Sequence, residues 1–324
     1  MAGWNNGSVS ESRSAARRRV LRRRRQRRAL VLLTLATVLI ALLVVVLPRA
    51  LAPDDAVAEP ASDPASPSAV PANTPSPTPA VPEPDPLPCE TDAVTTALRT
   101  GTDRDVIAAF GGAEPFRAAI ADAEAPCIDL HEAGRIWVVA NKRHPLDPVD
   151  YWPTPQARPQ DTRIIAGGWL RDETAAALDE LSADVRDAAG FIGVSSGFRP
   201  YDFQVDTYDR YVAMRGKAAA DLRSARPGHS EHQTGLAVDV VACDSDCGDH
   251  DGFGGTPQSD WIAANAWRYG FIVRYEDGRT ATTGYSAEPW HLRFVGRELA
   301  AAYVDGGFHT LEEFFGLEPA PDYG

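Results

Sequence analysis

The sequence predicts an α+β domain that follows one hydrophobic segment and a proline-rich linker. Short stretches rich in β-branched residues alternate with stretches whose apolar residues recur every three or four positions, and this mixture is typical of α+β folds. The expected strands are 191–196 (FIGVSS), 236–241 (LAVDVV), 271–275 (FIVRY) and 290–295 (WHLRFV). The expected helices are 172–189, 202–215, 260–269 and a last one that begins at Thr310, with Glu313 at capping-box spacing.

Charge is distributed unevenly along the 324 residues. The chain has 32 basic and 45 acidic side chains, which gives a formal net charge of −13. Ten arginines and one acid lie in residues 1–28, so this tip carries +9 and the rest of the chain carries −22. Because nucleic-acid binding depends on clustered cations, the acidic bulk excludes a nucleic-acid-binding domain.

A run of 19 uncharged, mostly apolar residues at 29–47 explains the basic tip. As a helix the run would span roughly 28 Å, about the hydrocarbon thickness of a bilayer. The arginines before it indicate a cytoplasmic N-terminus, with residues 1–28 inside the cell and everything after the segment outside. A cleaved secretory signal is the alternative, since residues 56–58 have the A-x-A form.

The linker at 48–88 separates this membrane segment from the domain. Twelve prolines and no aromatic residue occur in 51–88, so the linker cannot bury a core and is expected to be an extended tether. Residues 89–324 remain. They are long enough for a small helical subdomain at 89–134 and a larger domain at 135–324.

All four cysteines follow the membrane segment, and an even number in an exported region predicts disulfides. They are Cys89, Cys127, Cys243 and Cys247. Pairing Cys89 with Cys127 and Cys243 with Cys247 keeps each bridge local, but the sequence leaves the other two pairings open. Metal binding by Cys243 and Cys247 is less well supported, because no second Cys/His pair accompanies them at structural-zinc spacing.

Two histidine-containing segments suggest a catalytic metal site. His232 precedes Asp239 by seven residues with a glycine between them, and His291 leads into the last expected strand. Zinc takes imidazole and carboxylate ligands, and a catalytic site uses three of them and leaves a position for water. Glu288, three residues before His291, is then free to take a proton from the attacking water. No H-E-x-x-H motif is present.

Five blocks spread over about 170 positions resemble the VanY-like D-alanyl-D-alanine carboxypeptidases, a family related to the VanX-type dipeptidases. They occur in the family's order: VVANKRHPLDPVDYWP (138–153), SSGFRPYDFQ (195–204), PGHSEHQTGLAVDV (227–240), YGFIVRY (269–275) and EPWHLRFVG (288–296). The resemblance implies the zinc D,D-peptidase fold, in which helices flank a small antiparallel sheet. It also implies one Zn²⁺ per chain, bound by His232, Asp239 and His291, with Glu288 as general base.

The resemblance further assigns Arg199 to the active site. There a guanidinium could stabilise the oxyanion of the tetrahedral intermediate or clamp the terminal carboxylate of the substrate. Ser230, Gln204 and Trp290 are the candidates for substrate binding. His250 lies in a Gly/Asp-rich stretch and is expected in an exposed loop.

Together these observations predict a membrane-anchored, extracytoplasmic zinc D,D-carboxypeptidase. Its expected partners are peptidoglycan stem peptides ending in D-Ala-D-Ala, and the lipid bilayer through residues 29–47. A stem-peptide endopeptidase and a non-catalytic wall-binding module are the alternatives. The complete catalytic set disfavours the second of these. The sequence leaves the preferred stem peptide and the oligomeric state open.

Overall fold

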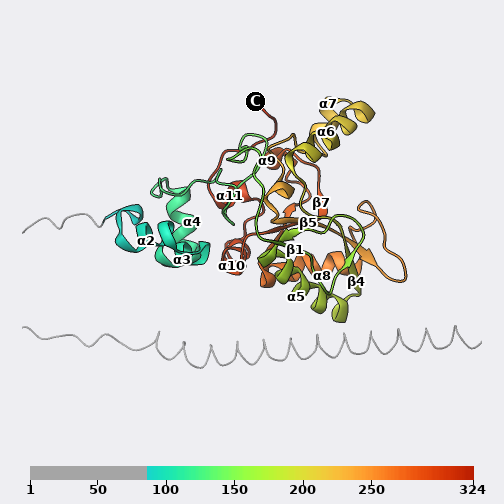
Figure 1. Cartoon of the computed structure of the whole chain (residues 1–324), viewed down its shortest axis with the longest axis horizontal. Coiled ribbons are helices and arrows are strands. Elements are labelled where there is room, and N and C mark those ends of the chain that lie inside the picture. Colours follow the sequence, from blue (N-terminus) through green and yellow to red (C-terminus); the bar gives the residue numbers. More distant parts are fainter. Residues whose placement is uncertain (1–85) are drawn as a thin grey trace, which may run out of the picture. The chain divides into compact units, whose positions relative to one another are not determined.

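The computed structural model describes residues 86–324, whose arrangement is shown in Figure 1. The expected cytoplasmic tip, the hydrophobic segment at 29–47 and nearly all of the linker at 48–88 lie outside this range. Among the described residues, no helix has both the length and the apolar character needed to cross a membrane.

A five-stranded sheet carries the residues of interest. Its order is β2 (Arg163–Ile164), β4 (Phe191–Ser196), β5 (Ala237–Cys243), β7 (Glu288–Phe294) and β6 (Phe271–Tyr275). The pairs β4–β5, β5–β7 and β6–β7 are antiparallel, as expected, but β2 runs parallel to β4. The sheet is therefore mixed, and β2 corrects the prediction of a wholly antiparallel one. A separate two-stranded sheet pairs β1 (Gln156–Ala157) with β3 (Leu170–Arg171).

The helices cover the sheet. In Figure 1, α5 (Asp172–Ala188) and α8 (Pro257–Asn265) lie near β4 in the lower part of the view, and α6 (Tyr201–Arg215) and α7 (Lys217–Asp221) lie at the top, beyond β5 and β7. Leu178, Leu181 and Val185 recur at helical spacing in α5 and are fully buried. This stripe is the apolar face that the sequence predicts, and it packs near β4.

The expected helix at 260–269 differs from the observed one. Helix α8 begins at Pro257, because Thr256 caps it by accepting a hydrogen bond from the Ser259 amide. From Ala266 the chain continues as the 3₁₀ helix η4 (Ala266–Tyr269), which ends at Gly270 with φ +88°. A glycine takes this left-handed conformation without steric cost, so Gly270 turns the chain directly into β6.

The expected small helical region is observed as η2 (Pro88–Glu90), α2 (Asp92–Thr100), α3 (Asp103–Ala109) and α4 (Ala113–Ala121). Thr91 and Thr102 cap α2 and α3. The ring of Phe116 in α4 lies 5.2 Å from that of Trp137, so these helices share a core with the larger region. The division at residue 134 stays a prediction.

The remaining elements are short. They are η3 (Glu231–Thr234), α9 (Thr280–Thr283), α10 (Arg297–Asp305) and α11 (Leu311–Phe314). Thr310 caps α11 by accepting a hydrogen bond from the Glu313 amide, as its position predicts.

Both local disulfides are present. Cys89 is bonded to Cys127, and Cys243 is bonded to Cys247. The first bridge ties η2 to the chain after α4, and the second closes the turn after β5. The alternative of a metal held by Cys243 and Cys247 is therefore wrong.

Candidate active site

The three predicted metal ligands come from two neighbouring strands and one short helix. Asp239 in β5 lies directly opposite His291 in β7, so both side chains leave the sheet on the same face. His232 lies in η3, which Gly235 joins to β5 with a φ of +72°. A side chain at Gly235 would also meet the Arg171 amide nitrogen at 3.1 Å, so the turn that delivers His232 requires glycine.

These three side chains form a buried triangle. His232 Nε2 lies 3.2 Å from one oxygen of Asp239, and His291 Nδ1 lies 3.1 Å from the other. One ligand atom from each residue lies within 4.8 Å of the others. Two imidazole nitrogens and a carboxylate at this separation form the donor set that Zn²⁺ takes in catalytic sites, so the residues fit the metal.

Hydrogen bonds on the far side of each ring set the orientation of both histidines. His232 Nδ1 donates to the Gly197 carbonyl oxygen at 2.8 Å. His291 Nε2 donates to Glu231 Oε2 at 3.1 Å. We assign the ring protons from these acceptors, so the opposite nitrogen of each ring is directed to the centre of the triangle.

Burial and charge shift the pKa of both histidines. Burial, together with the positive charge of Arg199, lowers the pKa of His232 to about 4. Burial also acts to lower the pKa of His291, but hydrogen bonds to Asp239 and Glu231 outweigh it and raise the value to about 9. A metal would therefore have to displace a proton from His291 on binding.

Glu288 begins β7 and lies beside the triangle rather than in it. Its Oε2 is 3.8 Å from His291 Nδ1, and the side chain is largely buried. Burial is the largest effect on its pKa, the negative charge of Asp239 adds to it, and together they raise the value to about 7. A carboxylate with this pKa can both take up and release a proton near neutral pH.

The triangle and Glu288 border a cavity of about 370 Å³. Arg199 lines it, and its backbone N–H donates to the carbonyl of His232 at 3.2 Å. Its Nε is buried and has no hydrogen-bond partner among the described residues. A buried donor without a partner is costly, so Arg199 is suited to an anion that enters the cavity. Arg215 and Arg223 add positive charge to the wall.

Two of the three predicted substrate-binding residues line this cavity, and the third does not. Ser230 and Trp290 are in its lining. Gln204 is fully buried in α6, where its amide donates to the Ala225 carbonyl at 2.6 Å and to Ser224 Oγ at 3.3 Å. In this position Gln204 does not line the cavity. Its side-chain amide instead supports the chain at Ser224 and Ala225.

His250 also lines the cavity, although the sequence predicts it in an exposed loop. Its Nε2 lies 2.5 Å from Ser195 Oγ, and its ring stacks on Trp290 with centroids 5.3 Å apart. The Cys243–Cys247 disulfide precedes this segment and folds it back toward the sheet. Only the pair of cysteines just before His250 could have indicated that the loop is held in place.

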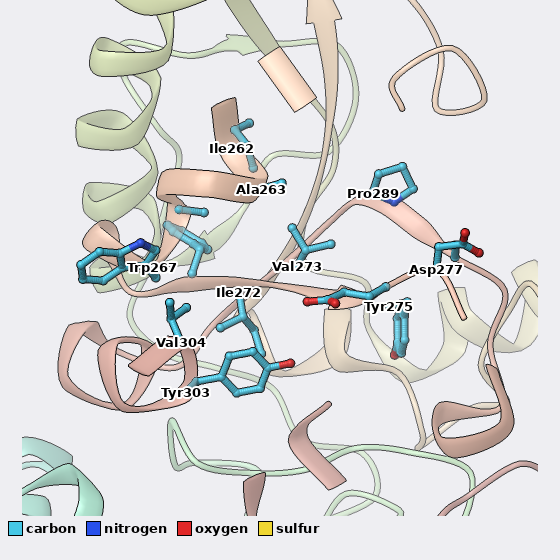
Figure 2. Close-up of a pocket in the computed structure, with 14 residues that line it drawn as sticks. Ile262, Ala263, Trp267, Ile272, Val273, Tyr275, Asp277, Pro289, Tyr303 and Val304 are labelled. Atoms are coloured by element: carbon cyan, nitrogen blue, oxygen red, sulfur yellow. The ribbon is translucent and has the colours of Figure 1, made fainter. Parts of the chain in front are cut away.

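A second cavity, of about 520 Å³, lies between α8, β6 and α10. Figure 2 shows its wall, where Ile262, Trp267, Val273 and Tyr303 present mostly apolar surface. Glu276 and Asp277 are its only carboxylates among the described residues. It contains none of the predicted catalytic residues.

A metal-ligand triangle beside a proton-accepting carboxylate is the arrangement of a metal-dependent hydrolase. Residues 167–297, which include both ligand segments, match the family model described as VanY, D-alanyl-D-alanine carboxypeptidase. The chain belongs to this family, and the expected class of zinc metallopeptidase is confirmed.

One curated relative and two solved structures are similar to the chain. The putative carboxypeptidase YodJ of Bacillus subtilis is 35% identical over 184 residues, which are 56% of this chain and 67% of that protein. The solved LdcB LD-carboxypeptidase is 34% identical, with a TM-score of 0.52 over 56% of this chain and 86% of that one. The vancomycin resistance D,D-pentapeptidase VanY, solved with Zn(II), is 31% identical, with a TM-score of 0.45 over 56% and 99%.

Proposed function

We propose that the chain is a zinc D,D-carboxypeptidase that removes the C-terminal D-Ala from peptidoglycan stem peptides. The observation that carries the proposal is the buried triangle of His232, Asp239 and His291, with Glu288 beside it. The family to which the chain belongs supports the same reaction.

When bound, zinc would supply the Lewis acid that polarises the scissile carbonyl and makes a water molecule acidic enough to attack. Glu288 takes the proton from the attacking water and passes it to the leaving nitrogen as the C–N bond breaks. The products are the shortened peptide, now ending in a carboxylate, and one free amino acid. Burial acts to raise the pKa of Glu288, which makes its carboxylate a better proton acceptor than an exposed one.

Arg199 is positioned for an anion, and two anions arise in this reaction. One is the oxyanion of the tetrahedral intermediate, and the other is the terminal carboxylate of the substrate. We propose the oxyanion as its partner, because Arg199 lines the same cavity as His232 and Glu288 and its charge acts on both. Arg215 and Arg223 are then available to attract the carboxylate.

Removal of D-Ala from an L,D bond is a second candidate, because the solved relative with a TM-score of 0.52 is an LD-carboxypeptidase. Stem pentapeptides ending in D-Ala-D-Ala and tetrapeptides ending in a single D-Ala, digested separately and analysed by mass spectrometry, distinguish the two. Loss of one Ala from the pentapeptide alone supports our proposal. Loss from the tetrapeptide alone supports the L,D reaction, and internal cleavage supports the endopeptidase.

We also propose that residues 29–47 anchor the protein in the cell membrane with the catalytic domain outside. The 19-residue uncharged run behind an arginine-rich tip supports this topology. Protease added to intact spheroplasts should release a soluble, active fragment by cutting within 51–88. A fragment that stays protected until the spheroplasts are lysed would mean the opposite orientation.

A further inference from the structure

Glu231, which sequence reasoning did not single out, lies directly behind the metal ligand His291. Its side chain is fully buried. One carboxylate oxygen accepts the hydrogen bond from His291 Nε2 at 3.1 Å. The other accepts from Arg274 Nε and from Arg293 Nη1, each at 2.9 Å.

These contacts exclude Glu231 as a metal ligand. It faces the Nε2 side of the His291 ring, whereas the triangle is built on the Nδ1 side. Both of its oxygens are already engaged by donors. It is the first residue of η3, so the same short helix supplies the ligand His232 and the residue that supports His291.

We propose that Glu231 is a positioning residue, which fixes the ring of His291 so that Nδ1 faces the metal. This inference rests on the proposed metal site. A carboxylate that accepts from a ligating imidazole sets the tautomer and the ring orientation, and it makes the ligating nitrogen more basic. The two arginines keep Glu231 charged and stop it from turning away, because each donates to the oxygen that His291 does not use.

The support extends well beyond the site. Arg274 also donates two hydrogen bonds to Glu312 in α11, at 2.8 and 3.0 Å, and Glu312 accepts a further one from Asn141 at 2.9 Å. Arg293 donates to the carbonyls of Ile136 and Val138. The hydrogen-bond network around Glu231 therefore continues to α11 and to residues 136–141, which lie far away in sequence.

The test is the affinity for Zn²⁺ alone, measured by competition with a chromophoric chelator, in the wild-type chain and in Glu231→Gln. The amide of Gln offers a single acceptor oxygen, so it cannot serve both His291 and the two arginines. We expect the dissociation constant for zinc to rise about 10- to 100-fold. The visible spectrum of the Co²⁺-substituted protein should change as well, because the ring of His291 is no longer held.

The matched control is Glu312→Gln, which breaks the same network at its remote end without touching His291. Glu312→Gln should lower the stability of the fold but leave the zinc affinity within about threefold, well short of the loss expected when a group bonded to a ligand is removed. Equal loss of zinc affinity in both variants would overturn the proposal, since the effect would then be general destabilisation. Unchanged affinity in folded Glu231→Gln would overturn it too.

If Glu231→Gln does not fold, Arg293→Lys tests the same support, because lysine keeps the charge but not the planar fork. Like Glu231→Gln, it should weaken zinc binding, and unchanged zinc affinity would overturn the proposal. Failure of the proposed function gives a different result. In that case the wild-type chain itself would not bind zinc or would not release alanine.

Discussion

Glu288 and His291 are three residues apart in the same strand, yet the structure gives them different tasks. His291 is in the ligand triangle, whereas Glu288 lies beside it with a pKa raised to about 7 by burial and by Asp239. Glu288→Gln should therefore keep its zinc while kcat falls about 10²- to 10⁴-fold, the usual contribution of a positioned proton acceptor. Metal analysis and steady-state kinetics on the same preparation measure both quantities.

His291→Ala is the control for this experiment, because it should lose zinc and activity together. Loss of zinc from Glu288→Gln would make Glu288 a ligand. Near-normal turnover in that variant would make it a bystander, and another residue would have to take the proton.

Arg199→Lys separates the two anions that Arg199 could bind. If it stabilises the oxyanion, kcat should fall with little change in KM, because an ammonium cannot reproduce the fork of a guanidinium at that position. If it clamps the terminal carboxylate, KM should rise instead. Arg186→Lys on the exposed side of α5 is the matched control, and both constants should stay at wild-type values there.

The sequence identifies the ligands but not their supports. His232, Asp239 and His291 stand in recognisable motifs, and the structure brings them together. Glu231 precedes His232 in the same motif, but nothing in the local sequence distinguishes a solvated carboxylate from one bonded to His291. Its role depends on Arg274 and Arg293, which reach it only after β6 and β7 have paired.

At the scale of elements, the strands at 191–196 and 271–275 are predicted with their observed bounds. Gly190 and Gly270, both with positive φ, precede them and mark where each strand begins. The two-residue strand β2 could not be predicted, since two residues are too few to show the alternation of apolar and polar side chains that marks a strand. Its parallel pairing with β4 arises only when distant segments meet, so the mixed character of the sheet is a tertiary property.

Helix α11 has only four residues, but it carries Glu312, whose charge is buried. Burial alone would raise the pKa of Glu312, but Arg274 and Asn141 outweigh it and hold the pKa below its ordinary value of 4.5. A lowered folded-state pKa stabilises the fold above the unfolded pKa, and this contribution is lost as the pH falls through the folded value. Glu312→Gln should therefore lower the free energy of unfolding by about 3–5 kcal/mol at pH 7.

The difference between Glu312→Gln and wild type should begin to shrink as the pH falls below 4.5, and it should be lost only when the pH passes below the lowered pKa of the folded state. Urea unfolding at pH 7 and over a series of lower pH values measures it. Glu313→Gln, the partly exposed neighbour paired with Arg279, is the control and should change stability by less than about 1 kcal/mol. A difference that does not depend on pH would show that the charge of Glu312 is not what stabilises α11.

For the whole molecule, metal and fold should be linked. Zinc that binds only the folded chain stabilises it by about 2.7 kcal/mol at a free concentration 100 times the dissociation constant. For a domain of this size the gain corresponds to a rise in Tm of roughly 5–10 °C. Scanning calorimetry with and without added zinc should show this rise in Tm. An activity assay should show complete loss of activity after chelation.

The two disulfides remain after chelation, so the metal-free chain should still unfold cooperatively at its lower Tm. A Tm that does not respond to zinc would mean that the triangle of His232, Asp239 and His291 does not bind it in the folded state.

The facing positions of Asp239 and His291 have a consequence for how the sheet assembles. Adjacent residues of a strand point to opposite faces, so a slip of one residue between β5 and β7 would turn one of the two ligands away from the other. The observed register brings the donors together, so a metal that binds them would favour this pairing over one slipped by a single residue. Besides its proposed part in hydrolysis, the ion would stabilise the correct alignment of β5 and β7 while the chain folds.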